Sequence, residues 1–302
     1  MPETVLHHII SMCRNFLWTG DIRRQYSALV AWKTLCLPKS EGGLGLFDLK
    51  ARNRSFLAKQ LWNIHLKTDS IWIQWVHHYY VHTKSVWDIQ AHSRSSPLWK
   101  VVLSVRDILT QQCGSPRESI QLLSSWSYGV NPFLAQAYHF FRPAAPTVPW
   151  HQVVWEDWSL PKYRFILWLA VLGKLRTRDR LQFLHIDPSC VFCRQEDESH
   201  QHLFFLCGWS CNLWSQVTSW LQIDEPMNSL PSALRGMHPK KRSHAARMRR
   251  VSLGIVIYLI WEERNRRVFE RNSRSINTIF RRFQILFFTI LHFHVKANSL
   301  PG

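Results

Sequence analysis

The chain contains 302 residues, with 38 Lys and Arg against 20 Asp and Glu, so its formal net charge is +18 and its pI is near 10.1. This excess of positive charge favours a polyanionic partner, RNA or DNA before an anionic membrane surface. The seven cysteines are an odd number, and Cys13, Cys36, Cys113 and Cys211 have no evident partner, which argues against the disulfide framework of a secreted protein.

Neither a membrane span nor a secretion signal is predicted. The longest apolar runs, residues 255–261 and 285–291, fall well short of the ~20 residues that a membrane helix needs. The first residues lack the basic segment and uniformly apolar stretch of a signal peptide. We therefore expect an intracellular protein, nuclear or cytoplasmic, that is not secreted and has no membrane partner.

Residues 1 to about 90 predict helices that share one core. Apolar side chains recur at helical spacing from Val5 to Leu17, and a second amphipathic helix is expected across 56–65. Between them, residues 38–46 hold three glycines and one proline, which favour a tight, extended connection. This loop lacks the spacing of a Walker A or dinucleotide-binding motif, so we do not predict phosphate binding there.

The middle of the chain changes composition twice. Residues 91–125 are rich in Ser, Gln and Arg with one short apolar run, and they predict a loosely packed connector with one helix. From residue 126 the aromatic density rises, and 166–175 predict a buried helix. Thr177 is the expected N-cap of the next helix.

The spacing Cys190-x2-Cys193-x8-His202-x4-Cys207 predicts a structural Zn²⁺ site. Three thiolates and one imidazole close a tetrahedral shell, which leaves no open position for a catalytic water. His202 and Cys207 would diverge on an ideal α-helix, so we expect the chain to turn between them and a helix to begin near Cys207. Two alternatives stay open: buried cysteines beside a surface histidine, or Cys211 as the fourth ligand.

The C-terminal part is strongly basic. Residues 240–282 hold thirteen Lys and Arg against three Glu, a net +10. The helical period there suggests one buried stripe and one arginine-bearing stripe that follows a phosphate backbone. The alternatives are a solvated helix face or a nuclear-import signal at 239–242. The candidate nucleic-acid-binding residues are Lys240, Lys241, Arg242, Arg264, Arg266, Arg267 and Arg271.

Several motifs together resemble the zinc-binding domain that follows the reverse transcriptase in plant LINE-type, non-LTR retroelements. The matching residues are Trp155, Pro161-Lys162, Phe165, Trp168-Leu169, Leu175, Thr177-x-Asp179-Arg180-Leu181, Cys190-x2-Cys193, Glu198-Ser199-x2-His202-Leu203-Phe204-Phe205-x-Cys207 and Trp214. Upstream, Phe16-Leu17-Trp18-x-Gly20, Val30-Ala31-Trp32 and Cys36-x-Pro38-Lys39-x-Glu41-Gly42-Gly43-Leu44-Gly45 are similar to the segment after the thumb of that polymerase. Ile260-Trp261-x2-Arg264-Asn265-x-Arg267-x-Phe269 resembles the helix that trails the zinc domain.

The expected fold is mainly α, with helical bundle segments and a small zinc-stabilised helical domain. The expected parts are a helical post-thumb remnant at 1–90, a connector at 91–125, a zinc-binding domain at 126–222 and a basic helical tail at 240–302. The resemblance implies RNA or DNA as partner, together with other parts of a retroelement polyprotein, and no small-molecule substrate.

No enzymatic activity is expected. Reverse transcriptases hold two metal ions on aspartates that include an adjacent pair, and this sequence contains neither an Asp-Asp pair nor a recognisable polymerase palm. No carboxylate cluster suits a ribonuclease H or endonuclease, and no Ser or Cys lies in a nucleophile motif. The predicted function is a non-catalytic zinc-binding and nucleic-acid-binding C-terminal fragment of a reverse transcriptase, and the alternative is a nonfunctional retroelement relic.

Overall fold

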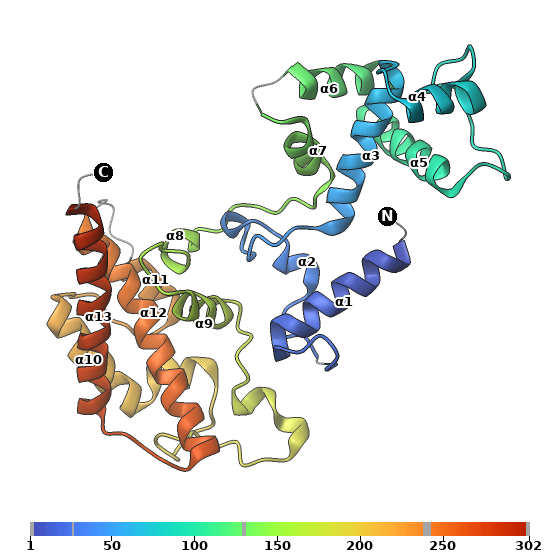
Figure 1. Ribbon diagram of the computed structural model, residues 1–302. Coiled ribbons are helices and arrows are strands. Elements are labelled where there is room, and N and C mark those ends of the chain that lie inside the picture. Colours follow the sequence, from blue (N-terminus) through green and yellow to red (C-terminus); the bar gives the residue numbers. More distant parts are fainter. Residues whose placement is uncertain (1–2, 26, 129–130, 238–242, 300–302) are drawn as a thin grey trace. The chain divides into compact units, whose positions relative to one another are not determined.

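The structure, a computed structural model, describes residues 3–25, 27–128, 131–237 and 243–299 (Figure 1). Within these ranges the regular elements are helices, and the only β-type pairing is an isolated antiparallel bridge between Ser189 and Asp197. The expectation of a mainly α fold is confirmed. The chain divides into two compact units, Met1–Pro38 with Gly43–Ala145, and Lys39–Gly42 with Pro146–Gly302. These units do not coincide with the four predicted parts.

The first unit is built around α3. Its core combines residues from α3, α5, α6 and α7, among them the fully buried Leu61, Val102, Leu123 and Ala137. Asp48 caps the N-terminus of α3, because its carboxylate accepts hydrogen bonds from the backbone N–H groups of residues 50 and 51. The helical elements of this unit are α1 (Glu3–Thr19), α2 (Trp32–Leu35), α3 (Leu49–His65), α4 (Ile71–Val76), the π-helical turn η2 (His77–Val81), α5 (Pro97–Cys113), α6 (Pro116–Tyr128) and α7 (Phe133–Phe141).

The prediction of a loose connector at 91–125 was wrong. Two helices, α5 and α6, occupy most of this range, and Trp99, Leu109 and Leu123 lie in the core of the first unit. Polar residues between the apolar ones lowered the average hydropathy and hid the helical spacing. Gly114 separates the two helices with a φ of 93°, a left-handed conformation that suits the end of a helix.

The glycines near residue 43 are explained by close backbone packing. A Cβ atom on Gly43 would lie 2.0 Å from the carbonyl oxygen of Leu37, so only glycine fits there. The Gly43 N–H donates to the carbonyl of Pro38, at 3.0 Å. This backbone donor is thus already used within the loop.

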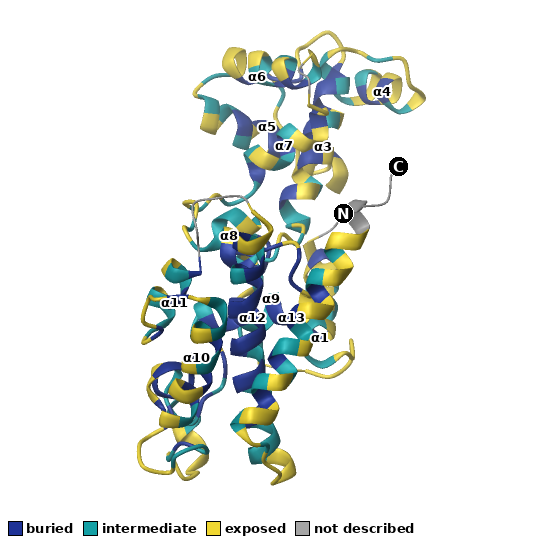
Figure 2. Ribbon diagram, turned by 90° about the vertical axis from the view of Figure 1, so that its left-hand side faces the viewer, coloured by how far each residue is buried: buried dark blue, intermediate teal, exposed yellow. Residues whose placement is uncertain are grey.

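The second unit surrounds α12, which Figure 2 shows buried along most of its length. α12 packs against α8, α9, α10 and α13. The loop segment 39–42 joins this unit, since the Trp168 indole donates to the carbonyl of Gly42 at 2.8 Å. The elements are η1 (Lys39–Glu41), α8 (His151–Val154), α9 (Pro161–Val171), η3 (Arg178–Arg180), η4 (Gln182–Leu184), η5 (His202–Leu206), α10 (Gly208–Leu221), α11 (Leu230–Gly236), α12 (His244–Asn265), η6 (Arg266–Glu270) and α13 (Ile276–Ser299).

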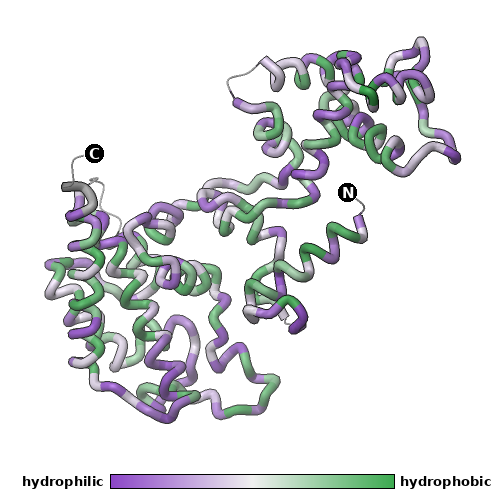
Figure 3. The backbone as a smooth tube through the Cα atoms, in the orientation of Figure 1, coloured by the Kyte–Doolittle hydropathy of each residue, from purple (hydrophilic) through white to green (hydrophobic). Residues whose placement is uncertain are grey.

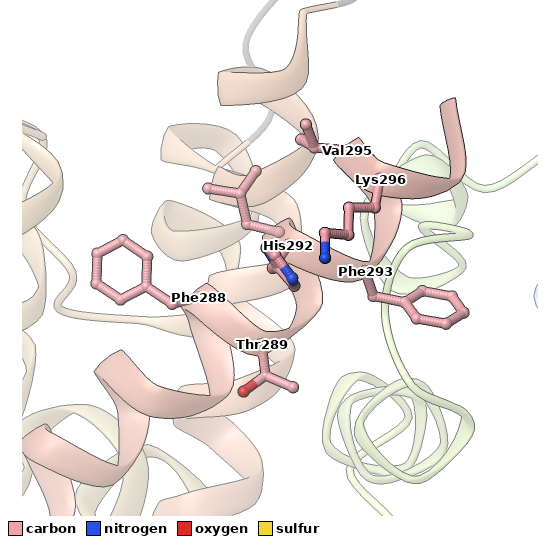
Figure 4. Close-up of a pocket in the computed structure, with 7 residues that line it drawn as sticks. Phe288, Thr289, His292, Phe293, Val295 and Lys296 are labelled. Atoms are coloured by element: carbon pink, nitrogen blue, oxygen red, sulfur yellow. The ribbon is translucent and has the colours of Figure 1, made fainter. Parts of the chain in front are cut away.

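α13 is amphipathic, and Figure 3 shows hydrophobic and hydrophilic residues alternating along it. Phe283 and Ile290 are buried against the second unit, whereas Phe288 and Phe293 are exposed. The exposed side carries a surface hollow whose lining residues come from this one helix (Figure 4). His292 lies in that hollow, but His294 stacks on Trp158 with ring centroids 4.8 Å apart.

No helix among the described residues is both long and apolar enough to cross a membrane.

Candidate metal centre

Four side chains gather at one point of the second unit, and they are the four that the spacing predicts. The ligand atoms of Cys190, Cys193, His202 and Cys207 all lie within 4.8 Å of one another. Cys190, His202 and Cys207 are buried and Cys193 is half-buried. No second group of three or more metal-ligating side chains meets elsewhere in the described ranges.

The distances fit a tetrahedral zinc shell. With Zn–S bonds of about 2.3 Å and Zn–N bonds of about 2.0 to 2.1 Å, tetrahedral geometry puts two sulfurs about 3.8 Å apart and a sulfur and a nitrogen about 3.6 Å apart. The Sγ atoms of Cys190 and Cys207 are 3.8 Å apart, and Cys193 Sγ lies 3.3 Å from His202 Nε2. The donor set, soft thiolates with one imidazole, is the one that structural zinc prefers.

A tight hairpin presents the first two ligands. The bridge between Ser189 and Asp197 closes it, and the Cys190 N–H donates to the carbonyl of Glu196 at 2.7 Å. Arg194 adopts a left-handed φ of 56°, which turns the chain directly after Cys193. The backbone N–H of Phe192 points at Cys190 Sγ, at 3.5 Å, and would stabilise a thiolate there.

A π-helical turn brings the other two ligands together. The wider turn η5 pairs residues i and i+5, and the Cys207 N–H donates to the His202 carbonyl at 2.7 Å. His202 and Cys207 therefore face the same side, although an α-helix would separate them. The expected turn between them is present as a widened helix, and α10 begins at Gly208 as expected.

Cys211 is not part of this group. Its Sγ donates to the carbonyl oxygen of Phe205 at 3.0 Å. It is also exposed, unlike the buried Cys207 one helical turn earlier. Cys207 thus completes the set.

The thiol of Cys190 donates a hydrogen bond to the sulfur of Cys207 at 3.8 Å. The hydrogen bond to Cys207, followed by burial, raises the pKa of Cys190, and the same hydrogen bond lowers the pKa of Cys207.

Two acidic residues, Glu196 and Glu198, lie next to the four ligands and contact their surroundings. Glu196 Oε2 lies 3.0 Å from His202 Nδ1, without the alignment of a hydrogen bond, and leaves Nε2 directed at the cysteines. Glu198 is fully buried, and its Oε1 accepts from the Arg178 N–H at 3.1 Å and from Arg264 Nη2 at 2.8 Å. The hairpin is thereby joined to α12 by a buried ion pair.

The predicted nucleic-acid-binding residues have different environments. Lys240, Lys241 and Arg242 lie outside the described residues. Arg264 is buried against Glu198, which makes it an interior residue. Arg267 pairs with the buried Glu263 at 2.9 Å, and Arg266 lies 3.6 Å from Glu270. Arg271 is exposed.

Most arginines of the expected tail stripe therefore form ion pairs with carboxylates of the protein itself. Arg250 pairs with Glu156 at 2.6 Å, and Arg274 and Arg282 pair with Glu262. The physical reason is that α12 is central to the second unit, so a charged side chain on most of its positions needs a carboxylate partner. In the sequence Glu198 stood out only as a residue of the zinc-domain motif, and nothing local linked it to Arg264, 66 residues away.

Comparisons with known proteins point to the same region. Residues 133–214 match the family described as zinc-binding in reverse transcriptase, and this range contains all four residues of the candidate centre. An Arabidopsis thaliana protein named "Putative ribonuclease H protein" is 30% identical over 117 residues, or 38% of this chain. The chain covers 19% of the length of that relative.

No solved structure matches the chain. The family match and the plant relative instead agree with the sequence motifs and with the geometry of the cysteine and histidine cluster. The resemblance of this chain to the zinc-binding domain of reverse transcriptases is thus confirmed for residues 133–214.

Proposed function

We propose that this protein is a non-catalytic, zinc-stabilised nucleic-acid-binding part of a retroelement reverse transcriptase. The single observation that carries the proposal is the convergence of Cys190, Cys193, His202 and Cys207 within the segment that matches the family. RNA or DNA is the partner, other parts of a retroelement polyprotein are further partners, and the protein acts inside the cell. Residues 1–90 derive from the region after the polymerase thumb.

The metal has a structural role in this proposal. Bound Zn²⁺ supplies a cross-link between the hairpin and η5, with no position left for a reacting water. The four ligands hold the ion, and Glu196 lies beside the His202 ring. The buried ion pair between Glu198 and Arg264 connects the hairpin to α12. Structural zinc contributes on the order of 10 kcal/mol to such small modules.

The charge of the chain supports a polyanionic partner. The formal net charge of +18 remains after every ion pair inside the protein is counted, since each pair is already included in the sum. Attraction of this kind draws nucleic acid to the protein and weakens steeply with salt. The name of the plant relative refers to an enzyme that acts on nucleic acid, which agrees with this partner class.

The test uses the purified full chain, grown with zinc. Metal analysis should give about one Zn²⁺ per chain for the single four-ligand shell. Filter binding to structured RNA and to DNA, at several salt concentrations, should give a log affinity that falls linearly with log salt. A chain that binds neither nucleic acid at low salt would contradict the proposal, and so would primer extension above a no-protein control.

A further inference from the structure

A polar cavity lies beside the metal centre, between the hairpin and the segment that follows α12. Its volume is about 620 Å³, within the range of about 300 to 1,000 Å³ that is usual for ligand sites. Four arginines line it: Arg178 from η3, Arg194 from the hairpin, Arg267 from η6, and Arg271 directly after η6. Cys190 and Phe192 form part of its wall.

The charge in this arginine pocket is not balanced by the protein. Asp187 lies 3.4 Å from Arg178, and Glu263 lies 2.9 Å from Arg267. No carboxylate lies within ion-pair distance of Arg194 or Arg271 in the described ranges. The four arginines and the two carboxylates together leave a net charge of two positive units. A zinc centre with three thiolates carries one negative charge, so one positive charge remains when that centre is included.

Two of the arginines are fixed in place before any ligand binds. The Arg178 guanidinium donates to the carbonyl of Ser189 at 2.7 Å. The Arg267 guanidinium lies over the stacked rings of Phe192 and Trp209, 4.7 Å and 5.3 Å from their centroids. Guanidinium groups held in this way have lost most of their side-chain freedom already, which lowers the cost of binding an anion.

The other two arginines sit on unusual backbone. Arg194 has a φ of 56° and Arg271 a φ of 53°, a left-handed conformation that is unfavourable for a residue with a Cβ. Both are exposed at the pocket. Asn272 and Ser273 add polar groups next to Arg271.

We propose that the arginine pocket binds a phosphate group of a nucleic-acid strand. This inference rests on the proposed nucleic-acid function and gives it a location. Phosphate fits because forked guanidinium groups bind its oxygens in pairs, and because the lining is mostly polar. Arg178 and Arg267 provide the two guanidinium groups that are already fixed. Arg194 contacts the phosphate from the hairpin, and Arg271 contacts it from the end of η6.

The test compares two double variants of the full chain. Arg194→Ala with Arg271→Ala removes the two unpaired charges of the pocket. Arg235→Ala with Arg281→Ala is the matched control, since it removes two exposed arginines of the same unit that do not line the pocket. Fluorescence anisotropy would measure binding of a short single-stranded oligonucleotide, prepared with a 5′-phosphate and with a 5′-hydroxyl, at several salt concentrations. Zinc content and circular dichroism check that each variant folds.

The pocket variant should bind at least ~10-fold more weakly than the parent, and each lost phosphate contact should flatten the salt slope by roughly 0.7 to 0.9 units. The control should change by less than about 3-fold, as expected for the loss of distant, screened charge. A loss confined to the 5′-phosphorylated strand identifies a terminal phosphate, and an equal loss on both strands identifies a backbone phosphate.

Two results would overturn the proposal in distinguishable ways. If the parent binds and the pocket variant matches the control, the location is wrong while the nucleic-acid function stands. If the parent binds neither strand at low salt, the proposed function itself fails.

Inorganic pyrophosphate gives a second measurement, because it should displace the strand from the parent at lower concentration than from the pocket variant.

Discussion

The candidate metal centre consists of four side chains, Cys190, Cys193, His202 and Cys207. Cys211 is the nearest further thiol along the chain, but its Sγ is directed at the carbonyl of Phe205. Cys193→Ser should therefore abolish stoichiometric zinc binding, because a hydroxyl is a poor ligand for this soft site. Cys211→Ser is the control and should keep about one zinc per chain. Metal analysis after gel filtration measures both, and full zinc in the Cys193 variant would disprove the ligand set.

Arg264 and Arg266 are two residues apart and should behave in opposite ways. Arg264→Ala leaves the Glu198 carboxylate buried without its partner, which should cost about 3 to 5 kcal/mol. Arg266→Ala breaks a pair with Glu270, whose side chain is 63% exposed, and should cost less than about 1 kcal/mol. Urea unfolding of the second unit, followed by Trp fluorescence, would measure the difference. Equal losses would mean that the Glu198 pair does not hold the hairpin to α12.

Residue spacing was sufficient to predict which four cysteine and histidine side chains cluster, but not the ion pairs. The ligands lie within 18 consecutive residues, so their pattern is visible locally. The partners Glu156 and Arg250 are 94 residues apart, and only the folded chain brings them together. For this reason Arg264 was assigned to a nucleic-acid surface although it lies inside the protein. Arg178 and Arg194 were not proposed for such a surface, since both lie outside the basic segment 240–282.

For the secondary-structure elements, the helical spacing of apolar residues predicted the helices in segments that contain many apolar residues. α1 and α3 lie where their spacing placed them, and α10 begins next to Cys207. In 91–125 the prediction of one helix and loose packing missed α6 and the burial of both α5 and α6 in the core. It also left open how His202 and Cys207 meet, since a π-helical turn is set by tertiary packing and has no strong local signature.

The packing of α12 on α9 makes a prediction at Gly254. A Cβ there would lie 3.4 Å from Ser159 Oγ and from Tyr163 Cβ, an ordinary contact distance. Gly254→Ala should thus be neutral or stabilise by up to ~1 kcal/mol, because alanine favours the helix. Gly254→Leu should destabilise by about 1 to 3 kcal/mol, since the added atoms overfill the interface. Thermal unfolding of the two variants beside the parent checks the sign. A destabilised alanine variant would mean that the helices are closer than the structure has them.

For the whole molecule, the two units have separate cores. The core cluster of the first unit lies within residues 51–141 and contains no zinc ligand. In the second unit, the candidate metal centre is linked to the central α12 through Glu198 and Arg264. The sequence predicted the overall charge and fold class, but it placed the basic tail apart from the zinc-binding domain, whereas one compact unit contains both.

Removal of zinc should therefore affect the two units differently. A chelator leaves three thiols and an imidazole without their metal, and the lost contribution, on the order of 10 kcal/mol, is comparable with the whole stability of a typical domain. Amide hydrogen exchange should rise in 189–214 and, through the Glu198 pair, in α12. Exchange in α3 and α5 should stay unchanged, which provides the internal control. Faster exchange in both units would show that they fold as one, and unchanged exchange in 189–214 would show that the hairpin holds its shape without metal.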